Sequence, residues 1–242
     1  MNAANETIFP HTKSYPNASV VIAAFSGDTR ITFKSIILAL LLVAPLHIIA
    51  RSAEPLLAAA EEGDIVSVKR LLHRKTNVNI RDRHGDTALM WAAKEGHIEI
   101  VKLLIDSKAN VDLKNNGGWS ALMAATAAKH AEVVSVLIEA GADVNTSLKS
   151  GWTALMVASA AGLTDIAKIL LDSGAEVNAV GYPDFTALMA ASQAGRTEIV
   201  RMLIEAKADL NRQNQKGSTA LQIAREKGFQ EIVEMLVNAG AE

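Results

Sequence analysis

The chain has 242 residues, a formal net charge of −2 and no cysteine, and half of its residues are apolar. The lack of cysteine excludes disulfides, thiolate metal sites, a catalytic cysteine and lipid attachment through cysteine. The small net charge gives no electrostatic argument for nucleic acid or an anionic membrane as a partner.

Residues 1–30 are polar and match no repeated pattern, so we expect an extension without packed structure. After Lys34 comes an uncharged run from Ser35 to Ala50. As a helix this run would reach about 24 Å, which is shorter than the roughly 30 Å of a membrane's hydrocarbon core. A short apolar run between a basic residue and small residues is typical of a secretory signal peptide, and Ala50-x-Ser52 fits the cleavage rule.

The length of chain before Lys34 is unusual for a signal peptide and leaves three alternatives open. In the first, translation starts near residue 30 and residues 31–53 are the signal peptide. In the second, residues 35–50 are an uncleaved anchor in the inner membrane. In the third, they form a buried helix that caps the rest of the chain. The first two place the remaining residues outside the cytoplasm, because the basic flank keeps the N-terminus inside.

From residue 54 onward the chain consists of a repeated unit. The motif Thr-Ala-Leu-Met begins at Thr87, and its counterparts begin 33 residues apart at Ser120, Thr153, Thr186 and Thr219. An apolar-periodic segment follows each motif at a constant distance, and a segment such as Gly-Ala-Asp-Val-Asn at 141–145 follows that. A fixed period of 20–50 residues is typical of a stacked repeat protein.

The motifs Gly-x-Thr-x-Leu, Ala-Ala-x-x-Gly-His-x-Glu-Ile-Val (92–101) and Gly-Ala-Asp-Val-Asn resemble those of the ankyrin repeat family. The resemblance implies an all-α solenoid of helix-turn-helix units joined by β-hairpin turns. We place six units at 54–81, 82–114, 115–147, 148–180, 181–213 and 214–242. The first unit lacks its hairpin and has Ser67 and Arg70 in place of apolar residues, which suits the polar end of a solenoid.

Within a unit, we expect Thr153 to cap the first helix and Gly162 to allow the turn between the helices. Ile166 and Leu170 then belong to the buried stripe of the second helix, and Gly174 ends that helix in a left-handed conformation.

The chain departs from the family pattern in two ways. A methionine such as Met156 stands where the family commonly has His, and fills that space with a flexible apolar side chain. The hairpin at 181–185 has Asp184 in place of Gly, so we expect this turn to have its own shape.

The sequence contains no catalytic or metal-binding constellation, and we expect no enzymatic activity, cofactor or metal. His97 and His130 occupy the family's position between helices, where the resemblance implies a structural role. No His-x-x-x-His pair suggests zinc. Acidic residues such as Glu99 begin second helices, where a negative charge suits the helix dipole.

The resemblance implies a partner protein on the concave surface, which hairpin tips and the exposed sides of the first helices form. The residue before each Thr or Ser is aromatic in three consecutive units, and these residues form a row with small residues behind it, among them Val157, Ala160 and Ala190. Apolar, aromatic surfaces with a charged rim are typical of binding hot spots. The predicted partner-binding residues are Trp119, Trp152, Phe185, Tyr182, Trp91, Arg83, His84 and Asp86. In the alternative interpretation, the row only packs on adjacent hairpins.

We therefore expect a monomeric, non-enzymatic protein-binding module, exported to the periplasm of a bacterium or secreted. The compact Ala- and Met-rich repeats and the signal-like segment indicate the bacterial origin. The alternatives are a secreted effector acting on a host protein and a membrane-tethered regulator of a neighbouring enzyme or transporter. We expect no nucleic-acid partner, and contact with a membrane only through residues 35–50 if they are not cleaved.

Overall fold

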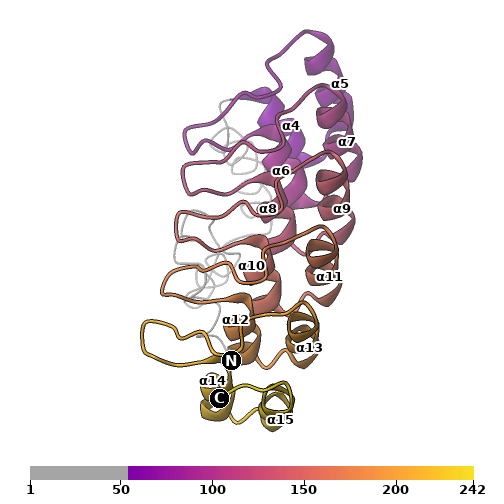
Figure 1. Ribbon diagram of the computed structural model, residues 1–242. Coiled ribbons are helices and arrows are strands. Elements are labelled where there is room, and N and C mark those ends of the chain that lie inside the picture. The colour runs from indigo at the N-terminus through magenta and orange to yellow at the C-terminus, as the bar shows by residue number, and fades with distance from the viewer. Residues whose placement is uncertain (1–53) are drawn as a thin grey trace, which may run out of the picture. The chain divides into compact units, whose positions relative to one another are not determined.

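The computed structural model describes residues 54–242. The predicted extension and the predicted signal peptide or anchor, residues 1–53, lie outside the described residues. Within 54–242 there are twelve helices in six successive pairs (Figure 1). The pairs are α4 (Pro55–Glu62) and α5 (Ile65–His73), α6 (Ala88–Glu95) and α7 (Ile98–Asp106), α8 (Ala121–Ala127) and α9 (Ala131–Glu139), α10 (Ala154–Ala161) and α11 (Thr164–Asp172), α12 (Ala187–Ala194) and α13 (Thr197–Glu205), and α14 (Ala220–Lys227) and α15 (Gln230–Asn238).

The helix pairs stack in the order of the chain. Each first helix packs on its own second helix and on the first helix of the next pair, and the second helices form a parallel layer. The loops between pairs project on the side opposite the second helices (Figure 1). The described residues thus form the all-α solenoid that the repeat predicted.

The loops between pairs are hairpin turns, and among the described residues none of them contains a regular β-strand. Three of them are closed by isolated antiparallel bridges, Arg81–Thr87, Ser147–Thr153 and Gly181–Phe185. Backbone groups near the loop tips also bond to the neighbouring loop. The amide of Asn116 donates to the carbonyl of His84 at 2.8 Å, and the amide of Tyr182 to that of Ser150 at 2.7 Å.

Each repeat motif starts a first helix through local side-chain chemistry. The hydroxyl of Thr153 accepts a hydrogen bond from the backbone N–H of Met156, and Thr87, Ser120, Thr186 and Thr219 cap their helices in the same way. The end of the helix is equally regular, because Gly162 takes a left-handed conformation at the C-cap (φ 77°). The motif therefore defines both the start and the end of a short helix.

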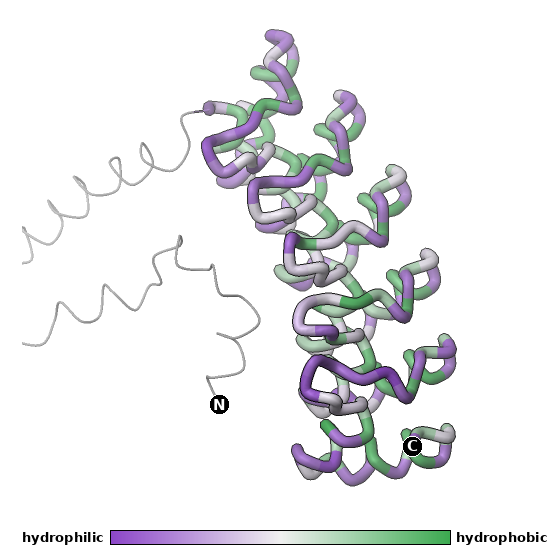
Figure 2. The backbone as a smooth tube through the Cα atoms, turned by 60° about the vertical axis from the view of Figure 1, so that its left-hand side comes forward, coloured by the Kyte–Doolittle hydropathy of each residue, from purple (hydrophilic) through white to green (hydrophobic). Residues whose placement is uncertain are grey.

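The core lies between the two helix layers and between successive repeats. Leu155, Ile166 and Leu170 are buried, as the sequence pattern predicted, and so is Met156 at the position where His is common in the family. Hydrophobic residues accordingly lie along the helices, whereas the projecting loops are mostly hydrophilic (Figure 2).

A row of side-chain-to-backbone hydrogen bonds joins the repeats outside the core, and we call it the side-chain ladder. In each rung an Asn or Asp side chain accepts the backbone N–H 31 residues later, at distances from 2.7 to 2.9 Å. Its rungs are Asn79–Asn110, Asp112–Asp143, Asn145–Glu176, Asn178–Asp209 and Asn211–Glu242.

Polar residues cover both ends of the described stack. At the first pair, Ser67 and Arg70 hydrogen-bond to each other at 3.1 Å. In the last pair, Gln222 and Arg225 are exposed at positions that are apolar or small in the preceding pairs. No helix in residues 54–242 combines the length and the apolarity needed to cross a membrane.

Candidate partner-binding surface

Part of the predicted aromatic row is internally packed. Trp119, Trp152 and Phe185 are each half-buried. The rings of Trp152 and Phe185 stack with their centroids 6.5 Å apart and their planes inclined by 14°. The Trp152 indole also reaches the next loop, where a Cβ at Gly181 would lie only 2.7 Å from it. The rings of Trp152 and Phe185 therefore pack against each other, and each keeps part of its surface in solvent.

Tyr182 lies beside this row with most of its side chain in solvent. It is 70% exposed, and among the described residues only Val66 and Val237 are also large hydrophobic residues with high exposure. Its backbone carbonyl, not its ring, accepts the hydrogen bond from Trp152 Nε1 at 3.0 Å. The exposed phenol therefore offers an aromatic surface that a partner could cover.

The loop at 181–185 does have features of its own, as expected. The peptide bond between Tyr182 and Pro183 is cis. Asp184 takes a left-handed conformation (φ 59°), which is the conformation of the glycine at the same position in the other loops, such as Gly151 (φ 79°). The replacement of glycine by Asp184 therefore leaves the backbone conformation at this position unchanged.

Small residues beside the row are less uniformly accessible than the sequence suggested. Val157, Ala160 and Ala190 are buried, whereas Ala128 and Ala194 are half-buried. The accessible part of the surface is therefore the aromatic row with its loop tips, and a narrower strip of the first helices.

At the N-terminal end of the surface, the predicted residues separate into two groups. Arg83 and His84 are exposed at a loop tip, where Arg83 Nε donates to His84 Nε2 at 3.0 Å. Trp91 is only 6% exposed and belongs to the core, with Lys94 Nζ 4.7 Å from its ring centroid. A buried indole offers little area to a partner, so Trp91 does not belong to the accessible surface, contrary to the prediction.

Asp86 occupies the position of the aromatic row one repeat before Trp119. Its carboxylate accepts a hydrogen bond from Asn115 Nδ2 at 2.6 Å, so it bonds to the loop that carries Trp119. Burial raises the pKa of Asp86, and the hydrogen bond from Asn115 opposes that effect. The sequence analysis did not single out Asn115. The signal was available, because an Asn or Asp four residues before Asp86 or Trp119 accepts a hydrogen bond from the backbone N–H of that residue and so stabilises the turn.

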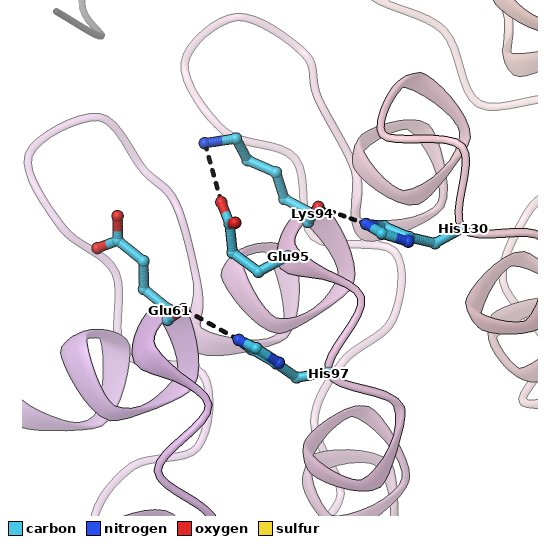
Figure 3. A network of polar contacts seen from close by, with 5 residues as sticks. All are labelled: Glu61, Lys94, Glu95, His97 and His130. Atoms are coloured by element: carbon cyan, nitrogen blue, oxygen red, sulfur yellow. Dashed lines mark hydrogen bonds and ion pairs between the residues drawn. The ribbon is translucent and has the colours of Figure 1, made fainter. Parts of the chain in front are cut away.

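The two histidines between helices have structural contacts (Figure 3). His97 Nε2 lies 3.1 Å from the carbonyl oxygen of Glu61, and His130 Nε2 lies 3.0 Å from that of Lys94. Each ring also covers a glycine of the preceding repeat, since a Cβ at Gly96 would come within 2.6 Å of His130. Each ring therefore ties one repeat to the one before it.

No group of three or more potential ligands in residues 54–242 is arranged to hold a metal ion. Two open hollows of about 310 and 370 Å³ lie at turns between helices, one next to residues 162–166 and the other next to 96–100. Neither hollow includes a residue of the aromatic row.

Comparison with known families decides the assignment. A family model described as ankyrin repeats in three copies matches residues 22–115, 56–148, 107–181 and 180–242. The chain belongs to the ankyrin repeat family. The first match begins upstream of residue 54, where we expected the resemblance to start. Ankyrin repeats are in general non-enzymatic modules for protein–protein interaction.

Two solved ankyrin-like structures illustrate the relationship. The chain is similar to an ankyrin repeat domain from Acinetobacter baumannii, with 34% identity, a TM-score of 0.73 and coverage of 78% of this chain and 98% of that one. It is also similar to a chain in the structure of a predatory endopeptidase from Bdellovibrio bacteriovorus in complex with an immunity protein. That match has 36% identity, a TM-score of 0.70 and coverage of 78% and 99%. No curated protein matches the chain.

Proposed function

We propose that this ankyrin repeat protein acts as a monomer that holds a partner protein on its concave surface, defined as the loop tips and the exposed strip of the first helices. The observation that carries the proposal is the row of Trp119, Trp152 and Phe185 with the exposed Tyr182 beside it. Aromatic side chains bring a large contact area at a low cost in conformational entropy, and they are enriched among the residues that dominate binding energy.

Tyr182 is the residue that tests this proposal most cleanly. Truncating its exposed ring leaves the backbone carbonyl that bonds to Trp152, so Tyr182→Ala should fold like the wild type. Gln215 is the matched control, because it is exposed at the equivalent tip position 33 residues later. A triple Ala variant of the aromatic row removes the rest of the surface.

The experiment is crosslinked affinity capture from the native host, with periplasm, membrane and medium kept separate. We expect one protein to be captured by the wild type and by Gln215→Ala, and to be lost with Tyr182→Ala and with the triple variant. Circular dichroism establishes that each bait is folded. Capture that is unchanged by all the aromatic substitutions would show that the row serves packing alone.

Export from the cytoplasm is the second part of the proposal, and it rests on the sequence of residues 31–53. N-terminal sequencing of the protein from its host tests it. A mature chain that begins directly after residue 50, 52 or 53 supports a periplasmic or secreted module. An intact 35–50 segment in the membrane fraction supports the tethered regulator instead, and mature protein in the medium supports the secreted effector.

Similarity to a chain from an endopeptidase–immunity protein complex favours a second candidate, an immunity-like role against a peptidase. In that case the captured partner is an endopeptidase of the same cell, and adding the purified chain lowers its rate of cleavage. Tyr182→Ala should then weaken the inhibition, while Gln215→Ala should not. A captured protein without peptidase activity argues against this candidate and leaves the general binding function in place.

A further inference from the structure

The exposed faces of the six second helices differ in charge. Residues at i, i+3, i+4 and i+7 share one face of a helix. In four of these helices the exposed stripe begins and ends with a carboxylate, and α15 begins its stripe with Glu231. The carboxylate pairs are Glu99 and Asp106, Glu132 and Glu139, Asp165 and Asp172, and Glu198 and Glu205.

Helix α5 of the first repeat is the exception. Its stripe consists of Val66, Lys69, Arg70 and His73, all exposed and none acidic. Val66 is 70% exposed and occupies the position where each of the other five second helices has a carboxylate. A basic and apolar face thus replaces an acidic one at a single end of the solenoid.

Two further cations extend this face beyond the end of the helix. Arg74 and Lys75 are exposed and bring the basic residues between positions 69 and 75 to five, counting His73. The carboxylate of Asp64 at the start of α5 is engaged by the backbone N–H of Ser67 at 3.0 Å. The small net charge of the whole chain therefore conceals a strong local asymmetry.

We propose that this basic face, consisting of Val66, Lys69, Arg70, His73, Arg74 and Lys75, docks on an anionic phospholipid surface. The negative potential of such a surface attracts clustered Lys and Arg side chains within a Debye length, about 8 Å at physiological ionic strength. An apolar side chain among the cations is the pattern of helices that lie in a membrane interface.

Two observations favour a lipid surface over an acidic protein. Helix α5 lies in the layer of second helices, on the side away from the loops between pairs (Figure 1), so a flat bilayer can approach its exposed face without meeting the loop tips. In addition, only four residues of sequence separate the uncharged run from Ser35 to Ala50 from the start of α4 at Pro55. The loop tips lie on the other side of the helices and stay available to a partner protein.

The test is co-sedimentation of the full chain with two kinds of vesicle, phosphatidylcholine alone and phosphatidylcholine mixed with phosphatidylglycerol. Residues 35–50 can enter either membrane, so the readout is the preference for the anionic vesicles. We expect the wild type to show this preference and to lose it as salt is added. The variant K69Q/R70Q/R74Q should bind the anionic vesicles about tenfold more weakly or worse.

The matched control is K102Q/K168Q/R201Q, which removes the same number of cations at positions equivalent to Lys69 in α7, α11 and α13. It should keep the preference for anionic vesicles. Val66→Glu places at position 66 the carboxylate that the other five second helices have there. This single exposed substitution should weaken the preference for anionic vesicles, and it provides a test if the triple variant fails to fold. Equal binding of the wild type to both vesicles, or equal losses in the triple variant and its control, overturns the proposal. Partner capture through Tyr182 is a separate readout, so either proposal can fail alone.

Discussion

The indole Nε1 of Trp152 donates a hydrogen bond to the backbone carbonyl of Tyr182 at 3.0 Å, so the aromatic residue of one loop holds the backbone of the next. Trp152→Phe removes this donor and retains an aromatic ring that can stack on Phe185. We expect the free energy of unfolding to fall by about 1 kcal/mol, the net contribution of a typical hydrogen bond. Urea denaturation measures the change, and Tyr182→Phe is the control because it retains the carbonyl acceptor. Equal stability of Trp152→Phe and wild type would assign the loop contact to packing alone.

Gly118 and Gly217 form a matched pair at the same position of different loops, with φ of 90° and 76°. A Cβ at Gly118 would lie 2.8 Å from the backbone nitrogen of Lys149, whereas nothing lies within 4 Å of a Cβ at Gly217. Gly217→Ala should therefore cost only the left-handed strain, about 1 kcal/mol, and Gly118→Ala should cost clearly more. Thermal unfolding of both variants compares them. A larger loss at Gly217 would contradict the packing of adjacent loops described above.

Ser159 and Leu155 lie one turn apart in α10 and should respond in opposite ways to alanine. The Ser159 hydroxyl is buried and makes no hydrogen bond, so Ser159→Ala should leave stability unchanged or raise it. Leu155 is buried between repeats, and Leu155→Ala should cost about 2–5 kcal/mol. Denaturant unfolding measures both. A clear loss in Ser159→Ala would mean that the hydroxyl has a partner in solution, such as the carbonyl of the preceding turn.

The raised pKa of Asp86, which burial causes, predicts a pH-dependent effect of Asp86→Asn. The folded state binds the proton more tightly than the unfolded state, so the residue's contribution to stability is greatest below the ordinary aspartate pKa of about 3.9. That contribution falls as pH rises through the raised value. Asp86→Asn removes the charge and can still accept from Asn115, so it should raise the melting temperature at neutral pH, with no gain in acid.

Asp64 provides a comparison of opposite sign. Hydrogen bonds from Ser67 lower the pKa of Asp64 in the folded state. The ionised carboxylate therefore contributes to folding stability above the ordinary aspartate pKa, and this contribution is lost as pH falls through the lowered pKa. Melting temperatures across an acid-to-neutral pH series should therefore show opposite trends for Asp64→Ala and Asp86→Asn. Parallel trends would contradict the assignment of burial as the main effect at Asp86.

Features governed by local chemistry could be predicted from the sequence. The hydroxyl of Thr153 and the missing Cβ of Gly162 define the ends of α10 through contacts within a few residues, so one repeat motif was sufficient to place the helix. Because the motif recurs every 33 residues, the same prediction applied to the other first helices. The replacement of glycine by Asp184 led us to expect a different turn at 181–185, but Asp184 takes the left-handed conformation of the glycines in the other loops, and the distinctive feature of this loop is the cis Tyr182–Pro183 bond.

Exposure could not be predicted in this way, because it depends on neighbours from other repeats. Trp91 and Val157 occupy equivalent positions in first helices, and both are buried although we expected them to face the concave surface. The half-buried state of Trp152 likewise depends on Phe185 and Gly181 in the next loop. The left-handed backbone conformation of Lys108 (φ 69°) could not be predicted either. Its counterparts in later repeats, Gly141 and Gly174, suggested that only glycine adopts this conformation.

The side-chain ladder has a consequence for how such a chain can change its length. Every rung joins positions 31 residues apart, from Asn79–Asn110 at one end to Asn211–Glu242 at the other. Duplication or loss of a whole 33-residue unit therefore regenerates the same bond at each new junction. A shorter insertion between an acceptor and its donor moves them out of register and breaks that rung. Gene duplication can thus lengthen the solenoid in whole units without new joints, while smaller insertions are tolerated only where they leave both partners of a rung in place.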